Sequence, residues 1–304
     1  MLSKDLRDVT SSACCRSGPG LCLPSLLLLS FTSLASPHPS ACTPTSRSDL
    51  LLQPIKIPMS SAAPTTYLVT GANQGLGLGF VTALAKRPNS LIFATARNPD
   101  KADDLNALAA ETKNIEVVKF EATSEDDAIA LAKVVEEKAG KLDVVIANAG
   151  IAEATKGVVE VTHTDFIRHI ETNAWGPILL FQHTQPLLAK SGSPHFVGIT
   201  SVVGSLGTVS SLPARSTAYG ASKAALSYAV LKMGQEHPDL DAWVVHPGLV
   251  QTRMGNRAAS GLGFEKAPVT VKDSVAGILR ILDEAKRETH TGRFFEYTGK
   301  ELPW

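Results

Sequence analysis

Cysteine is absent from most of this chain. All four cysteines, Cys14, Cys15, Cys22 and Cys42, lie in the first 58 of the 304 residues. The remainder can therefore form no disulfide, thiolate nucleophile or cysteine-based metal site. The eight histidines are scattered without the spacing of metal ligands, so we expect no metal.

An excess of charge of one sign is also missing. The chain has 29 Lys and Arg residues against 29 Asp and Glu residues, and residues 1–58 hold only five of the basic and three of the acidic ones. A surface that binds nucleic acid needs clustered positive charge. We therefore expect a small-molecule substrate and no nucleic acid, and the charge balance leaves open whether the protein forms a homo-oligomer.

No hydrophobic run is long enough to span a membrane. The longest candidate, 21–34, is interrupted by Pro24 and is shorter than the ~20 residues that a transmembrane helix needs. Basic residues before this run and Ser-Leu-Ala at its end resemble a secretory signal peptide, whereas Asp5 and Asp8 are atypical of one. We expect no membrane span.

Met59 marks a change in the character of the sequence. Residues 59–304 have the size of one α/β domain, and Met59 is itself a natural start shortly before the first expected strand. We expect residues 1–58 to be a disordered upstream extension without function; a targeting signal and a tail of other use are the alternatives. The expected location is the cytoplasm, unless residues 1–35 direct secretion or organellar import.

Short apolar runs alternate with amphipathic stretches from residue 66 onward. This alternation is typical of a parallel sheet covered by helices on both faces. It predicts a single Rossmann-type, doubly wound α/β domain with a seven-stranded parallel sheet and a site along the carboxyl ends of the strands. The expected strands are 66–70, 91–96, 115–120, 142–147, 195–200, 242–246 and 293–297, and the expected helices are 77–86, 124–139, 164–189, 216–236 and 271–287.

Closely spaced glycines follow the first expected strand. Residues 67–77 read Tyr-Leu-Val-Thr-Gly-Ala-Asn-Gln-Gly-Leu-Gly. A glycine turn that opens a helix brings the backbone against a pyrophosphate, and the helix N-terminus faces the anion. The turn indicates dinucleotide binding, although such turns alone are weak evidence because they have many structural uses.

A tyrosine and a lysine are spaced four residues apart on the helix expected at 216–236. Tyr219 and Lys223 therefore project from nearly the same face, so the ammonium can favour the ionised phenol. Tyr228 and Lys232 repeat the spacing, but nine residues separate the two tyrosines and place them on opposite faces. Because Tyr219 lies near the helix start, beside the strand ends, we assign it to the site and expect Tyr228 to pack.

Further polar motifs come after the other strands in turn. Arg97 follows the second, residues 148–150 (Asn-Ala-Gly) the fourth, Ser201 the fifth and residues 247–248 (Pro-Gly) the sixth. Together with Asn173, the glycine turn and the Tyr-Lys pair, this order of motifs resembles the short-chain dehydrogenase/reductase family throughout residues 66–304.

The resemblance implies an NAD- or NADP-dependent enzyme in which Tyr219 donates or accepts the proton. Ser201 would hold the substrate oxygen, Lys223 would bind the nicotinamide ribose and lower the pKa of Tyr219, and Asn173 would support a water-linked proton path. The cofactor-binding residues it implies are Gly71, Asn73, Gln74, Gly75, Leu76, Gly77, Arg97, Glu121, Asn148, Ala149, Gly150, Tyr219, Lys223, Pro247, Gly248 and Thr252.

Arg97 favours NADP over NAD. A basic residue at the end of the second strand suits a ribose 2′-phosphate, whereas an acidic one would bind the 2′-hydroxyl. Gln74 is a contrary sign, since phosphate-preferring relatives often have a basic residue in the glycine turn. Glu121 is a second departure, because the family usually has Asp there.

Two loops set the expected substrate preference. The stretch 201–219 is longer than is common in the family, and 252–266, rich in Gly and Ala, is expected to be a mobile substrate lid. The ending 294–304 and the segment 94–98 look closest to fungal aromatic-polyketide ketoreductases and C-factor-like reductases. This resemblance implies a bulky, hydrophobic, aromatic or polyketide-like carbonyl substrate.

Three functions remain after the sequence is read. The leading one is an NADP-dependent carbonyl reductase or alcohol dehydrogenase. A dinucleotide-binding regulator could use the same fold without turnover, but it would not need Ser201, Tyr219 and Lys223. An epimerase or dehydratase acting on a nucleotide-linked sugar would need more room for its substrate than residues 59–304 offer.

Overall fold

The seven expected strands are present and form one parallel sheet. The computed structural model describes residues 63–153 and 155–304, so the expectations for residues 1–58 lie outside the described residues. The strand order is β3-β2-β1-β4-β5-β6-β7, which reverses direction at β1 as a doubly wound sheet does. The prediction of a seven-stranded Rossmann-type sheet is thus confirmed. The strands are β1 (Thr65–Val69), β2 (Ser90–Ala96), β3 (Ile115–Lys119), β4 (Val144–Ala147), β5 (His195–Ile199), β6 (Asp241–His246) and β7 (Phe294–Glu296).

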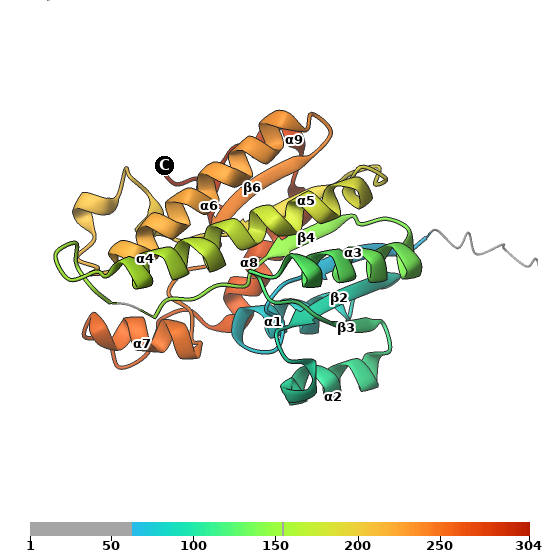
Figure 1. Cartoon of the computed structure of the whole chain (residues 1–304), viewed down its shortest axis with the longest axis horizontal. Helices are drawn as coiled ribbons and strands as arrows, with labels where there is room; N and C mark the ends of the chain where they lie inside the picture. The colour runs from blue at the N-terminus through green and yellow to red at the C-terminus, as the bar shows by residue number, and fades with distance from the viewer. Residues whose placement is uncertain (1–62, 154) are drawn as a thin grey trace, which may run out of the picture. The chain divides into compact units, whose positions relative to one another are not determined.

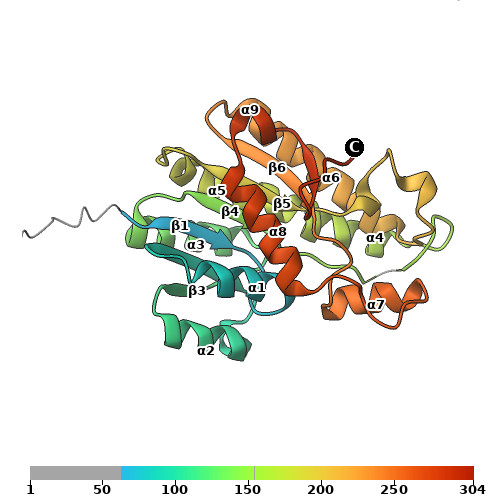
Figure 2. The ribbon, with the colours of Figure 1, turned by 180° about the vertical axis from the view of Figure 1, so that it is seen from behind.

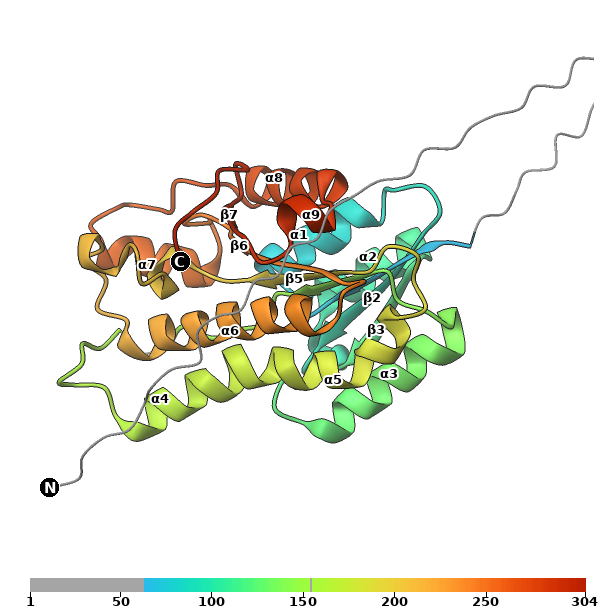
Figure 3. The same ribbon diagram turned by 90° about the horizontal axis from the view of Figure 1, so that it is seen from above.

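Helices cover both faces of this sheet (Figure 1). Seen from behind, α1 and α8 lie across one face (Figure 2). Seen from above, the sheet separates α1 and α8 from α3, α5 and α6 (Figure 3). The helices of the first face are α1 (Gly75–Leu84), α2 (Asp103–Thr112) and α8 (Val271–Glu284), and those of the second are α3 (Glu125–Ala139), α5 (Gly176–Leu188) and α6 (Thr217–Glu236).

Each sheet face has its own apolar core because successive residues of a strand point to opposite sides. Ile92 packs with Phe80 and Trp243 in one core, and its neighbour Phe93 packs with Phe196 in the other. All five side chains are fully buried. Burial on both faces explains why the strands read as nearly continuous apolar runs rather than alternating ones.

The helix expected at 164–189 is divided into three parts. α4 (His163–Ile170) leads into a wider π-helical turn, η2 (Glu171–Trp175), and α5 continues from Gly176. Gly176 approaches the neighbouring chain so closely that an added Cβ would lie 2.8 Å from the Cβ of Ala122. The expected single helix is therefore interrupted at η2, directly before Gly176 and Pro177.

Three helices of the described residues occur where the sequence does not predict them. α2 is short and buries only Leu105 completely, so its apolar face is narrow. α7 (Arg253–Gly261) occupies part of the expected mobile loop 252–266, and the prediction of a loop is wrong there. The Thr252 hydroxyl caps α7 by accepting a hydrogen bond from the amide of Gly255 at 3.0 Å. A short helix, α9 (Arg287–His290), precedes β7.

Two kinds of feature are absent from residues 63–153 and 155–304. No helix there is both long and apolar enough to cross a membrane. No group of three or more His, Cys, Asp or Glu side chains there is placed to hold a metal ion.

Candidate active site

The glycine turn between β1 and α1 has no room for side chains. Gly71 and Gly75 have φ angles of +63° and +57°, and a Cβ on Gly77 would lie 2.1 Å from the carbonyl oxygen of Gly71. Gln74 is the N-cap of α1, and its side chain makes no capping hydrogen bond. The first amides of α1 can therefore bind an anion, so this turn fits the pyrophosphate of a dinucleotide.

Thr70 and Asn148 join this turn to the end of β4. Thr70 Oγ1 accepts hydrogen bonds from the amides of Asn148 at 3.0 Å and Ala149 at 2.9 Å. Asn148 Nδ2 donates to the carbonyl oxygen of Thr70 at 2.8 Å. The predicted segment 148–150 thus lies beside the glycine turn. Thr70 was missed as a site residue, because the sequence indicates only the end of a strand there.

Ser201 and Tyr219 meet where β5 ends and α6 begins. Burial raises the pKa of Tyr219 to about 12, against the smaller opposite effect of a hydrogen bond with Ser201. The phenol therefore keeps its proton at neutral pH. The expectation that Lys223 lowers this pKa beside a bound cofactor stays a prediction, and burial of the phenol acts against it.

Lys223 is a buried cation with no carboxylate partner among the described residues. Its Nζ donates to the carbonyl oxygen of Ile199 at 2.7 Å and lies 5.8 Å from the centre of the Tyr219 ring. Burial lowers the pKa of Lys223 to about 8. One of the three ammonium hydrogens is bound to Ile199, so the other two can bind ligand oxygens such as ribose hydroxyls.

Asn173 lies fully buried in the π-helical turn η2. Its Oδ1 accepts from the amide of Ile151 at 2.7 Å, and its Nδ2 donates to the carbonyl oxygen of Ile151 and to Ser222 Oγ, both at 2.9 Å. A Cβ on Gly150 would lie 3.0 Å from Asn173 Oδ1 and 3.5 Å from Lys223 Nζ. Asn173 therefore connects the loop after β4 with α6 next to the lysine.

Arg97 follows β2 at the place expected for a phosphate-binding residue. Its side chain is 70% exposed, and its Nε lies 4.0 Å from Glu121 Oε2. The backbone amide of Glu121 donates to Asp127 at 2.9 Å, which fixes the backbone at that position. Arg97 is accessible to a ligand, but Glu121 competes for its charge.

Residues 247–252, which follow β6, lie next to the glycine turn. Gly248 has a φ of +82°, and a Cβ there would lie 3.0 Å from the ring of Tyr297. The Pro247 carbonyl oxygen accepts a hydrogen bond from Ser274 at 2.7 Å. A Cβ on Gly75 would lie 3.2 Å from Thr252 Cγ2, so the start of α7 touches the glycine turn. The turn residues Asn73, Gln74 and Leu76 are half-buried or exposed.

The second Tyr-Lys pair lies on the outside of α6. The Tyr228 side chain is 69% exposed, and Lys232 forms an ion pair with Glu236 at 3.0 Å. The expectation that Tyr228 packs is therefore wrong. The face of α6 that does pack carries Leu226 and Val230, both almost fully buried.

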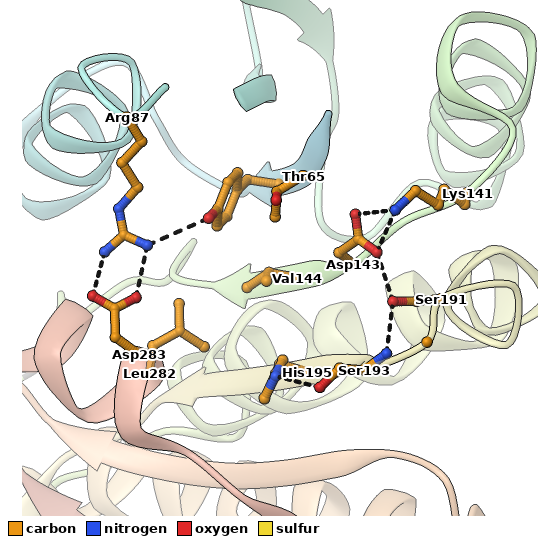
Figure 4. Close-up of a pocket in the computed structure, with 12 residues that line it drawn as sticks. Thr65, Arg87, Lys141, Asp143, Val144, Ser191, Ser193, His195, Leu282 and Asp283 are labelled. Carbon is orange, nitrogen blue, oxygen red and sulfur yellow. Dashed lines mark hydrogen bonds and ion pairs between the residues drawn. The ribbon is translucent and has the colours of Figure 1, made fainter. Parts of the chain in front are cut away.

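A recess at the amino edge of the sheet lies away from these residues (Figure 4). It has a volume of about 410 Å³. Arg87 is paired there with Asp283 at 2.7 Å, and Lys141 with Asp143 at 2.8 Å. Its charged groups already bind one another, and strand starts rather than strand ends surround it, so we place the active site at the carboxyl edge.

Comparison with known proteins shows the family to which the chain belongs. A family model described as short chain dehydrogenase matches residues 65–263. The norsolorinic acid ketoreductase of Emericella nidulans is 38% identical over 252 residues, which cover 81% of this chain and 95% of that protein.

Solved structures of carbonyl reductases share the fold. The NADPH-bound carbonyl reductase from chicken fatty liver is 31% identical with a TM-score of 0.72, covering 80% of this chain and all of that one. A Pseudomonas aeruginosa carbonyl reductase in complex with NADP is 29% identical with a TM-score of 0.68, again covering 80% of this chain and all of the other. The chain belongs to the short-chain dehydrogenase/reductase family of oxidoreductases.

Proposed function

We propose that this enzyme is an NADPH-dependent reductase of bulky hydrophobic ketones, with aromatic or polyketide-like carbonyl compounds as its substrates. The observation that carries the proposal is the position of Tyr219, in hydrogen-bond contact with Ser201 and next to the buried ammonium of Lys223. A phenol that is hydrogen-bonded to Ser201 and lies next to an ammonium is placed to exchange a proton with a substrate oxygen, as carbonyl reduction requires.

In this proposal each residue acts on the carbonyl oxygen or on the cofactor. NADPH supplies the hydride when bound. The hydroxyls of Ser201 and Tyr219 donate hydrogen bonds to the substrate oxygen as negative charge develops on it, and Tyr219 then transfers its proton. Lys223 binds ribose hydroxyls with its two remaining N–H groups and stabilises the phenolate that is left. Asn173 fixes the loop after β4, and a water beside it would return the proton.

The proposed preference for NADP depends on Arg97. Its exposed guanidinium can form a charge-assisted pair with a 2′-phosphate. The solved relatives that hold NADPH or NADP support the same choice. The carboxylate of Glu121 competes with the 2′-phosphate for Arg97, so the preference for NADP over NAD is expected to be moderate.

The proposed substrate class depends on apolar side chains beyond the strand ends. Leu206 and Val209, on the loop after β5, are 80% and 55% exposed, and Met254 and Phe264, on and after α7, are 39% and 53% exposed. Both segments follow strands at the carboxyl edge, where open α/β sheets bind ligands. These side chains could bury a large apolar ketone, and the similarity to a norsolorinic acid ketoreductase agrees with this class.

The test is oxidation of NADPH, followed by its absorbance, with a panel of aromatic and aliphatic ketones. Tyr219→Phe should abolish turnover and leave NADPH binding unchanged, because the phenol is needed for proton transfer only. Tyr228→Phe is the matched control and should keep wild-type rates, since Tyr228 faces solvent. Near-normal turnover by the Tyr219 variant would refute the site.

A further inference from the structure

The last residues of the sequence fold back along β7. The amide of Leu302 donates to the carbonyl oxygen of Phe294 at 2.7 Å, and Glu301 pairs with Phe295 in an antiparallel bridge. The Trp304 ring lies on that of Phe294, with centroids 5.7 Å apart and planes 31° apart. Residues 301–304, here called the closing segment, are thus fixed to a strand of the central sheet.

The closing segment also holds the loop that follows β5. The amide of Gly207 donates to the backbone oxygen of Trp304 at 2.5 Å, and the Ser205 hydroxyl donates to the carbonyl oxygen of Pro303 at 2.7 Å. Ser205 is only 3% exposed, so its hydroxyl would be left buried and unsatisfied without this partner. A Cβ on Gly207 would lie 2.9 Å from the Trp304 oxygen, so no larger residue fits there. Figure 3 shows the end of the chain beside this loop.

The loop held in this way begins at Ser201. The Ser201 hydroxyl accepts a hydrogen bond from the amide of Val203 at 3.3 Å, and a single 3-10 turn, η3 (Val202–Gly204), follows it. A Cβ on Gly204 would lie 2.8 Å from Lys223 Cβ, and one on Gly220 would lie 2.9 Å from the Val203 carbonyl oxygen. The turn η3 is therefore in tight contact with α6, and the closing segment binds the residues immediately after it.

We propose that the closing segment is a positioning element of the active site. It holds the loop 201–208 against α6 and so keeps the Ser201 hydroxyl within hydrogen-bond distance of Tyr219. Its effect on turnover rests on the reductase function proposed above. The effect on the loop itself does not, and it can be measured without a substrate.

The first experiment is hydrogen exchange of the full chain carrying Trp304→Ala. Removal of the indole ring frees the closing segment from Phe294, so the amides of Val203, Gly204 and Gly207 should exchange at least about tenfold faster, while those of α6 keep their protection. Tyr228→Ala is the matched control, because it removes another exposed aromatic ring far from the loop. Unchanged exchange at 203–207 in the Trp304 variant would overturn the proposal.

The second experiment separates positioning from stability. With a ketone that the wild-type enzyme reduces, Trp304→Ala should lower kcat about tenfold to a hundredfold, leave the Kd of NADPH within about twofold, and recover activity in Trp304→Phe. A faster-exchanging loop with unchanged kcat would also overturn the proposal. If the wild-type enzyme reduces no ketone, the proposed function fails, and the exchange result still decides whether the closing segment holds the loop.

Discussion

The two edges of the sheet differ in whether their cations have carboxylate partners. At the amino edge two cations have carboxylate partners: Lys141 lies 2.8 Å from Asp143, and Arg87 lies 2.7 Å from Asp283. At the carboxyl edge Lys223 is nearly inaccessible and binds a single carbonyl oxygen. The amino edge therefore contributes stability, whereas the carboxyl edge reduces stability and gains a reactive group.

The size of this loss follows from the pKa of Lys223. Burial lowers it from 10.5 to about 8, which corresponds to roughly 3 kcal/mol lost from the folded state at neutral pH. That is a large share of the 5–15 kcal/mol by which most domains are stable, as an order of magnitude. A buried cation retained without a counter-charge is characteristic of a functional site.

The sharpest test of this comparison is Lys223→Met. Turnover should fall at least about a hundredfold, because no ammonium remains to bind the ribose and to stabilise the phenolate. The melting temperature at pH 7 should stay the same or rise, because no charge is then buried. A lower melting temperature, measured by calorimetry, would show that Lys223 is a stabilising group.

The amino edge should give the reverse result. Asp143→Asn removes a carboxylate that accepts hydrogen bonds from Thr66, Lys141 and Ser191, and it should lower the free energy of unfolding by about 1–3 kcal/mol with kcat unchanged. Asp283→Asn is the control at the same edge. Its side chain is 53% exposed, so the loss should stay below about 1 kcal/mol. Denaturant titration of the three proteins would distinguish these outcomes.

Cofactor choice at the carboxyl edge should respond to Arg97. Arg97→Asp removes the partner of the 2′-phosphate and adds repulsion, so the affinity for NADP should fall roughly tenfold or more, and preference should move toward NAD. Glu121→Gln should have a smaller effect of the opposite sign, because it releases Arg97 from a competing carboxylate. Titration of both cofactors into each variant measures this, and equal NADP affinity in all three proteins would exclude a role for the pair.

The pH dependence of stability should also differ between Asp143 at the amino edge and Lys223 at the carboxyl edge. The folded-state pKa of Asp143 is depressed by its hydrogen-bond donors, so its stabilising contribution is present above pH ~4 and is lost as the pH falls through the folded pKa. The folded-state pKa of Lys223 is also lowered, but Lys223 is charged below its pKa. The cost of burying this charge is therefore relieved as the pH rises from about 8 to 10.5. Its contribution to stability should therefore increase in that window while turnover decreases. Parallel changes in the two quantities, followed with Lys223→Met as reference, would contradict this assignment.

The smallest effect is expected from removal of residues 1–58. A chain that starts at Met59 keeps every residue named here for the site, so its melting temperature, NADPH affinity and turnover should equal those of the full chain. A clear loss of stability in the shorter protein would refute the expectation that the first 58 residues have no role in the domain.

The sequence predicts well those features that depend on local pattern. All seven strands are apolar runs bounded by turns, and helical geometry alone separates Tyr219, next to Lys223, from the exposed Tyr228 on α6. Features that depend on distant contacts are not predictable in this way. The partners of Ser205 and Gly207 are about a hundred residues further along the chain, and nothing near them indicates the contact.

The errors have the same physical origin. Sequence spacing shows the ammonium next to Tyr219 but not the burial that raises the pKa of the phenol. α7 was expected to be a loop because of its glycines, yet Gly255 is needed within the helix, where a Cβ would lie 1.9 Å from the carbonyl oxygen of Val250.

The Thr70 hydroxyl has a consequence for the order in which the protein forms. It joins the end of β1 to residues 78 and 79 positions later, so the glycine turn is without this support until β4 has been synthesised and has paired with β1. During translation the ribosome must therefore release more than a third of the domain before the dinucleotide site can exist. NADPH can stabilise the finished fold by mass action, but it cannot assist the early stages of folding.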